Sequence, residues 1–260
     1  MGVKGLWGFI AESYKLQIAT ILEYRASFLS QTIGMFLNDF FWIFFWYILF
    51  NRFESINGWD FHDALLMYMV ITGSWALANL SFSNVNALAS MIENGQLDYY
   101  LTLPKPVLLH VLIKTSYSSA GDLLFSIVLA AWILELSSIP LYLSVLISGA
   151  LIFLSWGILV NSITFWVGRF ESAAKAARDT LIIFAGYPFS VYSGMTRFVL
   201  MFLIPVGMII GIPVDLFQNF SWEWFLLLWV YTAAFFLLCV SFFYLGLRRY
   251  SSGNTMGMRG

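Results

Sequence analysis

Long apolar stretches separated by short polar connections occupy most of this 260-residue chain. No Asp, Glu, Lys or Arg occurs in residues 64–92, 136–168 or 224–247. A helix needs about 20 consecutive apolar residues to cross the hydrocarbon core of a bilayer. The pattern therefore predicts an all-α membrane protein with six transmembrane helices, forming a single domain over residues 1–260.

The predicted spans cover residues 28–50, 64–82, 107–134 and 141–167, a fifth that begins near Thr180 and meets Pro188, and residues 224–247. A short charged loop, residues 169–179, precedes the fifth span. Ahead of the first span, residues 2–27 alternate apolar positions with Lys4, Glu12, Lys15 and Arg25. This pattern predicts an amphipathic helix that lies in the membrane interface.

The stretch 194–220 is apolar, but Pro205, Gly207, Gly211 and Pro213 interrupt it. Proline removes a backbone donor and disturbs the preceding helical turn. We interpret this stretch as a re-entrant, broken helical hairpin before the last span. The alternative is one long kinked span over residues 181–214, and both interpretations leave an even number of crossings.

Composition supports the membrane assignment, because 60% of the residues are hydrophobic and only 10% are charged. Soluble domains carry about 25% charged residues. With both ends on one side, all of the 13 Lys and Arg residues except Arg52 and Arg197 fall on that face. The positive-inside rule then places both termini in the cytoplasm, as in a bacterial-type inner (plasma) membrane protein. The net charge of -1 gives no indication of nucleic-acid binding.

The sequence contains none of the motifs that would make this chain an enzyme. It lacks G-x-x-x-x-G-K-[ST], H-E-x-x-H and G-x-S-x-G, so phosphate-loop ATP binding, zinc proteolysis and serine-nucleophile chemistry have no support. His62 and His110 are predicted on opposite sides of the membrane, and Cys239 is the single cysteine. We therefore predict no catalytic residue, cofactor site or metal site.

Two acidic residues fall within predicted spans, Asp39 in the first and Asp122 in the third. Ionisable groups inside a membrane are costly and usually have a function. Each could serve proton or ion coupling, or form a polar contact between helices. As two isolated acids they do not make a proton relay.

The most specific segment is residues 91–106, MIENGQLDYYLTLPKP, which lies on the cytoplasmic side by the charge rule. An Asn-Gly pair indicates a helix end or turn. Apolar residues with an acid between them and two closing prolines then predict a short amphipathic element between two spans.

At this segment the chain resembles the permease subunits of ABC-2 type ATP-binding-cassette exporters. Their pattern (E/N)-G-x-L-D-x-x-L-x-x-P is matched here by Asn94, Gly95, Leu97, Asp98, Leu101 and Pro104. The likeness continues over most of the chain, through the N-terminal helix, the prolines before the last span and the closing residues 247–254. Asn94 departs from the acid that the family often has there.

The resemblance implies a permease subunit that forms the translocation path of an exporter for a hydrophobic or amphipathic substrate. Residues 91–103 would be the coupling helix that contacts a cytoplasmic ABC ATPase dimer, and the six motif residues would carry that contact. ATP-Mg would bind to the ATPase, not to this chain. A second permease subunit, the same chain or a different one, would complete the dimer within the lipid bilayer.

Two other functions remain open from the residues themselves. An ion-coupled secondary transporter would use Asp39 or Asp122, although the two halves show no convincing internal repeat. A membrane enzyme would need convergent nucleophile, base and metal ligands, which the sequence does not offer. The aromatic cluster on the first span suits a bulky amphipathic cargo, but lipid-facing positions account for it more simply; it comprises Phe40, Phe41, Trp42, Phe44, Phe45, Trp46 and Tyr47.

Overall fold

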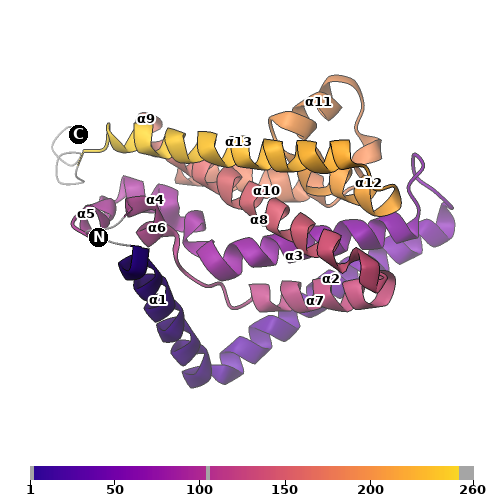
Figure 1. The fold of residues 1–260 in the computed structure, drawn as a ribbon, viewed down its shortest axis with the longest axis horizontal. Coiled ribbons are helices and arrows are strands. Elements are labelled where there is room, and N and C mark those ends of the chain that lie inside the picture. Colours follow the sequence, from indigo (N-terminus) through magenta and orange to yellow (C-terminus); the bar gives the residue numbers. More distant parts are fainter. Residues whose placement is uncertain (1–2, 104–105, 252–260) are drawn as a thin grey trace.

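A computed structural model describes residues 3–103 and 106–251, and these residues form an all-helical structure (Figure 1). Beyond the helices, the described residues contain two isolated β-bridges, Ile56–Trp59 and Phe82–Lys114. The helices in chain order are α1 (Val3–Glu23), α2 (Arg25–Arg52), α3 (Phe61–Phe82), η1 (Ser83–Ala87), α4 (Leu88–Glu93), α5 (Leu97–Leu101), α6 (Val107–Leu112), α7 (Ser119–Ile133), η2 (Leu136–Ser138), α8 (Ile139–Ser162), α9 (Thr164–Val167), α10 (Glu171–Ala185), η3 (Phe189–Val191), α11 (Gly194–Phe202), η4 (Gly207–Gly211), α12 (Ile212–Gln218) and α13 (Trp222–Leu247).

Four helical stretches of the described chain are long and apolar enough to cross a membrane: Arg25–Arg52, Phe61–Glu93, Leu136–Val167 and Trp222–Leu247. A fifth is added if the bent pair α11 and η4–α12 counts as one span. Helices α7 and α10 have 15 residues each, which is short of the roughly 20 that a straight crossing needs. The chain is thus a multi-pass helical membrane protein, and helix length alone supports fewer than the six predicted spans.

The predicted third span, residues 107–134, is interrupted. Helix α6 ends at Leu112, and the chain between it and α7 hydrogen-bonds to the end of α3 instead of to itself. The N–H of Ser83 donates to the carbonyl of Lys114 at 2.8 Å, and the N–H of Ser116 donates to the carbonyl of Asn79 at 3.0 Å. The predicted charged loop 169–179 also differs, because it is helical from Glu171, the first residue of α10.

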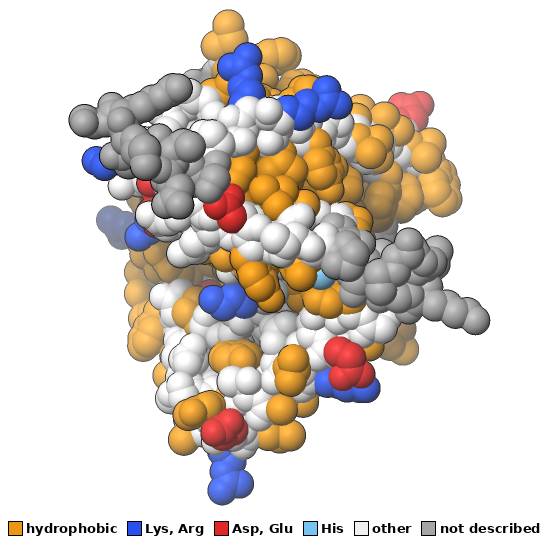
Figure 2. All heavy atoms as spheres, turned by 90° about the vertical axis from the view of Figure 1, so that its left-hand side faces the viewer, with side chains coloured by type: hydrophobic (Ala, Val, Ile, Leu, Met, Phe, Trp, Pro, Cys, Tyr) orange, Lys and Arg blue, Asp and Glu red, His pale blue; other side chains and the backbone are white. Residues whose placement is uncertain are grey.

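The start of α1, the end of α13 and the short helices α4, α5 and α6 gather at one end of the elongated molecule (Figure 1). Seen face-on, this end carries basic and acidic side chains scattered among hydrophobic ones (Figure 2). Helix α1 contacts this end through Tyr14 and Phe9. The hydroxyl of Tyr14 donates to the carbonyl of Ser81 at 2.9 Å, and the ring of Phe9 lies 4.1 Å from that of His110. Helix α2 then leaves in a different direction after a break at Tyr24.

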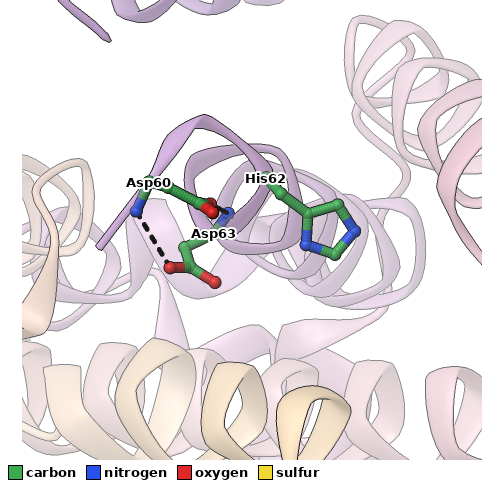
Figure 3. A group of neighbouring side chains, drawn as sticks. All are labelled: Asp60, His62 and Asp63. Carbon is green, nitrogen blue, oxygen red and sulfur yellow. Dashed lines mark hydrogen bonds between the residues drawn. The ribbon is translucent and has the colours of Figure 1, made fainter. Parts of the chain in front are cut away.

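At the opposite end, α3 begins with a reciprocal cap (Figure 3). The Asp63 carboxylate accepts the N–H of Asp60 at 3.0 Å, and the Asp60 carboxylate accepts the N–H of Asp63 at 3.1 Å. Gln218 of α12 donates to the remaining Asp63 oxygen. Although ligand atoms of Asp60, His62 and Asp63 lie within 4.8 Å of one another, the two carboxylates already serve as a helix cap and a link to α12.

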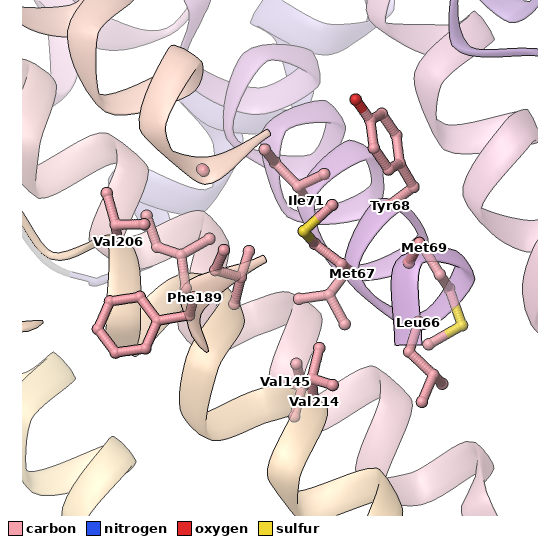
Figure 4. Close-up of a cluster of buried hydrophobic side chains, with 14 of the residues drawn as sticks. Leu66, Met67, Tyr68, Met69, Ile71, Val145, Phe189, Val206 and Val214 are labelled. Atoms are coloured by element: carbon pink, nitrogen blue, oxygen red, sulfur yellow. The ribbon is translucent and has the colours of Figure 1, made fainter. Parts of the chain in front are cut away.

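Helix α3 is the centre of the bundle. In its most apolar 18-residue stretch, 72% of the residues are buried, whereas the corresponding shares are 22% in α2 and 17% in α13. Figure 4 shows its side chains near Val145 of α8 and Val214 of α12, with Val206 and Phe189 farther along the same buried cluster. Helices α2 and α13 therefore flank the bundle and keep much of their apolar surface outside it.

The stretch 194–220 folds as a broken helical pair bent by 77°. Pro205 lies at the break and offers no N–H to continue α11. The π-helical turn η4 follows, and its residues Met208, Ile209 and Ile210 are fully buried. Met195 and Phe198 of α11 are 77% and 57% exposed. The η4 turn therefore enters the core, whereas these residues of α11 lie on the outside.

Helices α2 and α7 are in close contact at Gly121. A Cβ there would collide with the carbonyl oxygen of Thr32 and would lie 2.9 Å from the Cβ of Met35 and 3.0 Å from the N of Phe36. Since two of these atoms are backbone, α2 could not yield without moving as a whole. Glycine at this position therefore fixes the spacing of the two helices.

We expect Gly121→Ala to lower the thermal unfolding midpoint of the detergent-purified chain by several degrees, because overpacking costs roughly 1–3 kcal/mol. Gly34→Ala on α2 is the matched control, since a Cβ there meets nothing within 4 Å. It should leave the midpoint unchanged or raise it slightly. Equal midpoints for the two variants would show that α2 and α7 are not packed as described.

Candidate functional site

The segment predicted to couple to an ATPase, residues 91–103, is two short helices joined by a tight turn. Helix α4 ends at Asn94, and Gly95 follows with a φ of 70°. The N–H of Gln96 donates to the carbonyl of Met91 at 2.9 Å, and that of Gly95 donates to Ile92 at 3.4 Å. This is a Schellman motif at the end of a helix. It requires a left-handed backbone conformation, which glycine adopts without strain. Gly95 of the motif thus sets the angle between α4 and α5.

The motif residues divide between the interior and the surface. Leu97 is fully buried in a cluster with Ile92, Leu108 and Val111, so it anchors α5 to the rest of this chain. Leu101 is 43% exposed. Asn94 is also exposed, and its amide donates to the carbonyl of Ser90 at 2.9 Å. Pro104 lies outside the described residues.

The exposed side of α5 also presents Tyr99, which is 68% exposed and which the motif does not include. Tyr99 and Leu101 together give this helix an outward apolar surface. The sequence analysis grouped Leu97 and Leu101 as equivalent apolar positions, and only the fold separates the anchor from the surface residue.

Asp98 is half-buried beside Tyr250, just after the end of α13. Burial, together with the neighbouring Asp98, raises the pKa of Tyr250 to about 12. The phenol is therefore protonated at neutral pH. The ring of Tyr250 packs edge-on against Phe165 at 6.1 Å. The loop motif and the closing segment, distant in sequence, are thus neighbours in the fold.

Glu93, which the sequence analysis treated only as part of a turn, links α4 to α10. Its Oε1 accepts the backbone N–H of Phe170 at 2.5 Å and that of Glu171 at 2.6 Å. A carboxylate at a helix N-terminus satisfies orphan donors and interacts favourably with the helix dipole. Glu93 therefore joins the end of α4 to the start of α10.

The C-terminal part of α10 forms one wall of a cavity with a volume of about 430 Å³. Helices α2, α3, α7 and α8 supply the other walls. Its polar lining consists of Asn38, Asp39, Tyr68, Thr72, Asp122 and Tyr187, and its apolar lining of Met35, Trp42, Ile71, Trp75, Phe153, Ile182, Ile183 and Gly186.

The two acids that the sequence analysis treated as isolated lie side by side in this cavity, within hydrogen-bonding reach of each other. They are buried, at 6% exposure for Asp39 and 3% for Asp122. The Oδ2 atom of each has no hydrogen-bond donor among the described residues. Ionised carboxylates only accept hydrogen bonds. A proton or a cation between or beside the oxygens would therefore satisfy this pair.

Comparison with known proteins adds one match. A family model described as "ABC-2 family transporter protein" matches residues 36–254, which include the α4–α5 segment and every residue that lines the cavity except Met35. No curated protein and no solved structure matches the chain.

We expect Glu93→Ala to expose the start of α10. Hydrogen–deuterium exchange of the Phe170 and Glu171 amides should accelerate about ten-fold or more, because a hydrogen bond to a charged group contributes about 1.5–3 kcal/mol. Glu135→Ala, in an exposed loop, is the control and should leave these amides unchanged. Unaltered exchange in Glu93→Ala would contradict the link between α4 and α10.

Proposed function

The chain belongs to the ABC-2 transporter family, and we propose that it is the permease subunit of an exporter powered by a separate cytoplasmic ATPase. The single observation that carries the family is the match over residues 36–254. The sequence lacks a phosphate-loop motif, which is consistent with ATP-Mg binding on the partner and not on this chain.

In this proposal the bundle crosses the bacterial-type inner (plasma) membrane six times, through α2, α3, α7, α8, α10 and α13. The extended segment before α7 adds length to a helix that is otherwise short. Helix α1 lies in the interface, and α11 with η4–α12 forms the re-entrant hairpin. Both termini are cytoplasmic, and the gathering of α4, α5 and the two ends of the described chain at one end of the bundle supports this orientation.

The α4–α5 segment is the proposed coupling element. Asn94 and Gly95 shape its turn, Leu97 anchors it, and Asp98 holds it beside the end of α13. Tyr99 and Leu101 supply the outward apolar surface for a groove on the ATPase. Pro104 belongs to the same motif on sequence grounds.

The bond from Glu93 to α10 gives the proposed coupling a mechanical route. ATP-driven movement of the ATPase would displace α4–α5, and α10 would follow because its first turn is capped by Glu93. Helix α10 lines the cavity, so the displacement would reach a binding site for a hydrophobic or amphipathic substrate. The nucleotide then acts by stabilising one of two packed arrangements.

A dimer of permeases, from two copies of this chain or from two different chains, would complete the transporter. Most residues in the apolar stretches of α2 and α13 are not buried by the rest of the chain. Lipid and a second permease subunit are the two kinds of partner that such surfaces suit within a membrane.

An ion-coupled secondary transporter is the second candidate. The pairing of Asp39 with Asp122 supports it, whereas in the sequence the two acids were treated as isolated. Transport driven by a proton or sodium gradient in vesicles that lack ATP would select this candidate. Transport that requires ATP hydrolysis and persists without a gradient would select the exporter.

We expect ATPase activity to copurify with the tagged chain from native membranes and to be lost in Leu101→Asp, because a charge would face an apolar groove. Leu136→Asp is the matched control, since Leu136 is 92% exposed in the loop before α8. It should retain the activity. An absence of ATPase activity in the wild-type preparation would count against the exporter, whereas its retention in Leu101→Asp would count against α5 as the contact.

A further inference from the structure

The cavity beside α2 has a chemistry that points to a class of ligand. We propose that it binds an organic monocation with an apolar body, such as a substituted ammonium, with the Asp39–Asp122 pair receiving the cationic group. The inference rests on the proposed permease function, and it narrows the substrate to cationic amphiphiles.

The charged side chains of the lining are all acidic. Its ionisable acids are Asp39 and Asp122, and none of the residues that line the cavity is Lys, Arg or His. One oxygen of each carboxyl has no donor among the described residues, although both side chains are more than nine-tenths buried. Two adjacent buried carboxylates repel each other, so one proton or one cation relieves the pair. A pair that retains one proton carries a single negative charge, which matches a monocation.

The remaining walls disfavour a bare metal ion. Divalent magnesium or calcium needs about six or more oxygen ligands. The larger part of this lining is aromatic or aliphatic and offers no oxygen ligand. Trp42, Tyr68 and Trp75 contribute aromatic rings to the lining. The faces of such rings attract organic cations through their quadrupoles. The volume of about 430 Å³ falls in the usual range for small-molecule sites.

Access to the cavity suits an amphiphile. The acids are buried, whereas Trp42, Ile183 and Tyr187 are 46%, 60% and 46% exposed. The cavity therefore opens between α2 and the end of α10, with an aromatic and aliphatic rim and an acidic interior. A molecule entering with its cationic group first would place that group at the acids and its apolar body at the rim.

The test is equilibrium binding of benzyltrimethylammonium to the purified full chain in lipid nanodiscs, measured by titration calorimetry. We expect Asp39→Asn/Asp122→Asn to weaken binding at least ten-fold and Trp42→Ala to weaken it several-fold. Asp215→Asn on α12 is the matched control, since Asp215 does not line the cavity, and it should bind as the wild type does. The Asn pair is nearly isosteric, and its thermal midpoint checks that the fold is kept.

Four results would overturn the inference. They are no binding by the wild type, unchanged affinity in the double Asn variant, and equal competition by neopentylbenzene, the uncharged isostere; the fourth, displacement of the probe by Mg²⁺ at low concentration, would favour a metal site. Binding by the isolated chain needs no ATPase, so a failure here is distinguishable from a failure of ATPase activity to copurify, which would refute the permease function instead.

Discussion

The close contact of α2 with α7 at Gly121 is the constraint on which the proposed site depends. Because no side chain separates the helices there, Asp122, the next residue, is brought beside Asp39 on the facing helix. Two unit charges about 4 Å apart repel by roughly 4 kcal/mol at an effective dielectric constant of 20. A proton or a cation beside the acids would relieve this repulsion, which is why the proposed site places the cationic group of the ligand at the pair.

The other half of the proposed mechanism lies at the end of the bundle that carries α4 and α5. Its parts come from four distant places in the chain: α1 through Tyr14, the motif segment, the start of α10 and the residues after α13. The Glu93 cap is a charge-assisted contact that joins the end of α4 to the start of α10. Among the described contacts of α13 at this end is the packing of Phe243 against Phe165.

Local hydrophobicity was enough to predict the long helices. The uncharged runs correspond to α3, α8 and α13, and the Pro and Gly interruptions correspond to the bent pair α11 and η4–α12. The features that the sequence did not predict depend on partners that are remote in the chain. The break before α7 exists because Ser83 and Asn79 take up the backbone groups of Lys114 and Ser116, and α10 starts early because Glu93 caps it.

The candidate site shows the same division. The motif drew attention to the proposed coupling segment, but an apolar pattern could not separate buried Leu97 from exposed Leu101, since both occupy leucine positions of one short helix. The acids were recognised individually as intramembrane groups, whereas their pairing required the α2–α7 contact. Gly121 beside Asp122 was the available signal, but a single glycine does not say which helix approaches it.

The position of the cavity also constrains the arrangement of a permease dimer. Helix α2 lines the cavity yet is mostly unburied in one chain, and the rim residues Trp42 and Tyr187 face outward. A second subunit packed against α2 would turn an opening toward the bilayer into an enclosed passage between subunits. Separation of the subunits at α2 would reopen it to lipid. The other side of the opening is formed by α10, whose first turn is capped by Glu93. In the proposed mechanism, movement of the α4–α5 segment would therefore shift α10 and change the width of the opening from the side opposite α2.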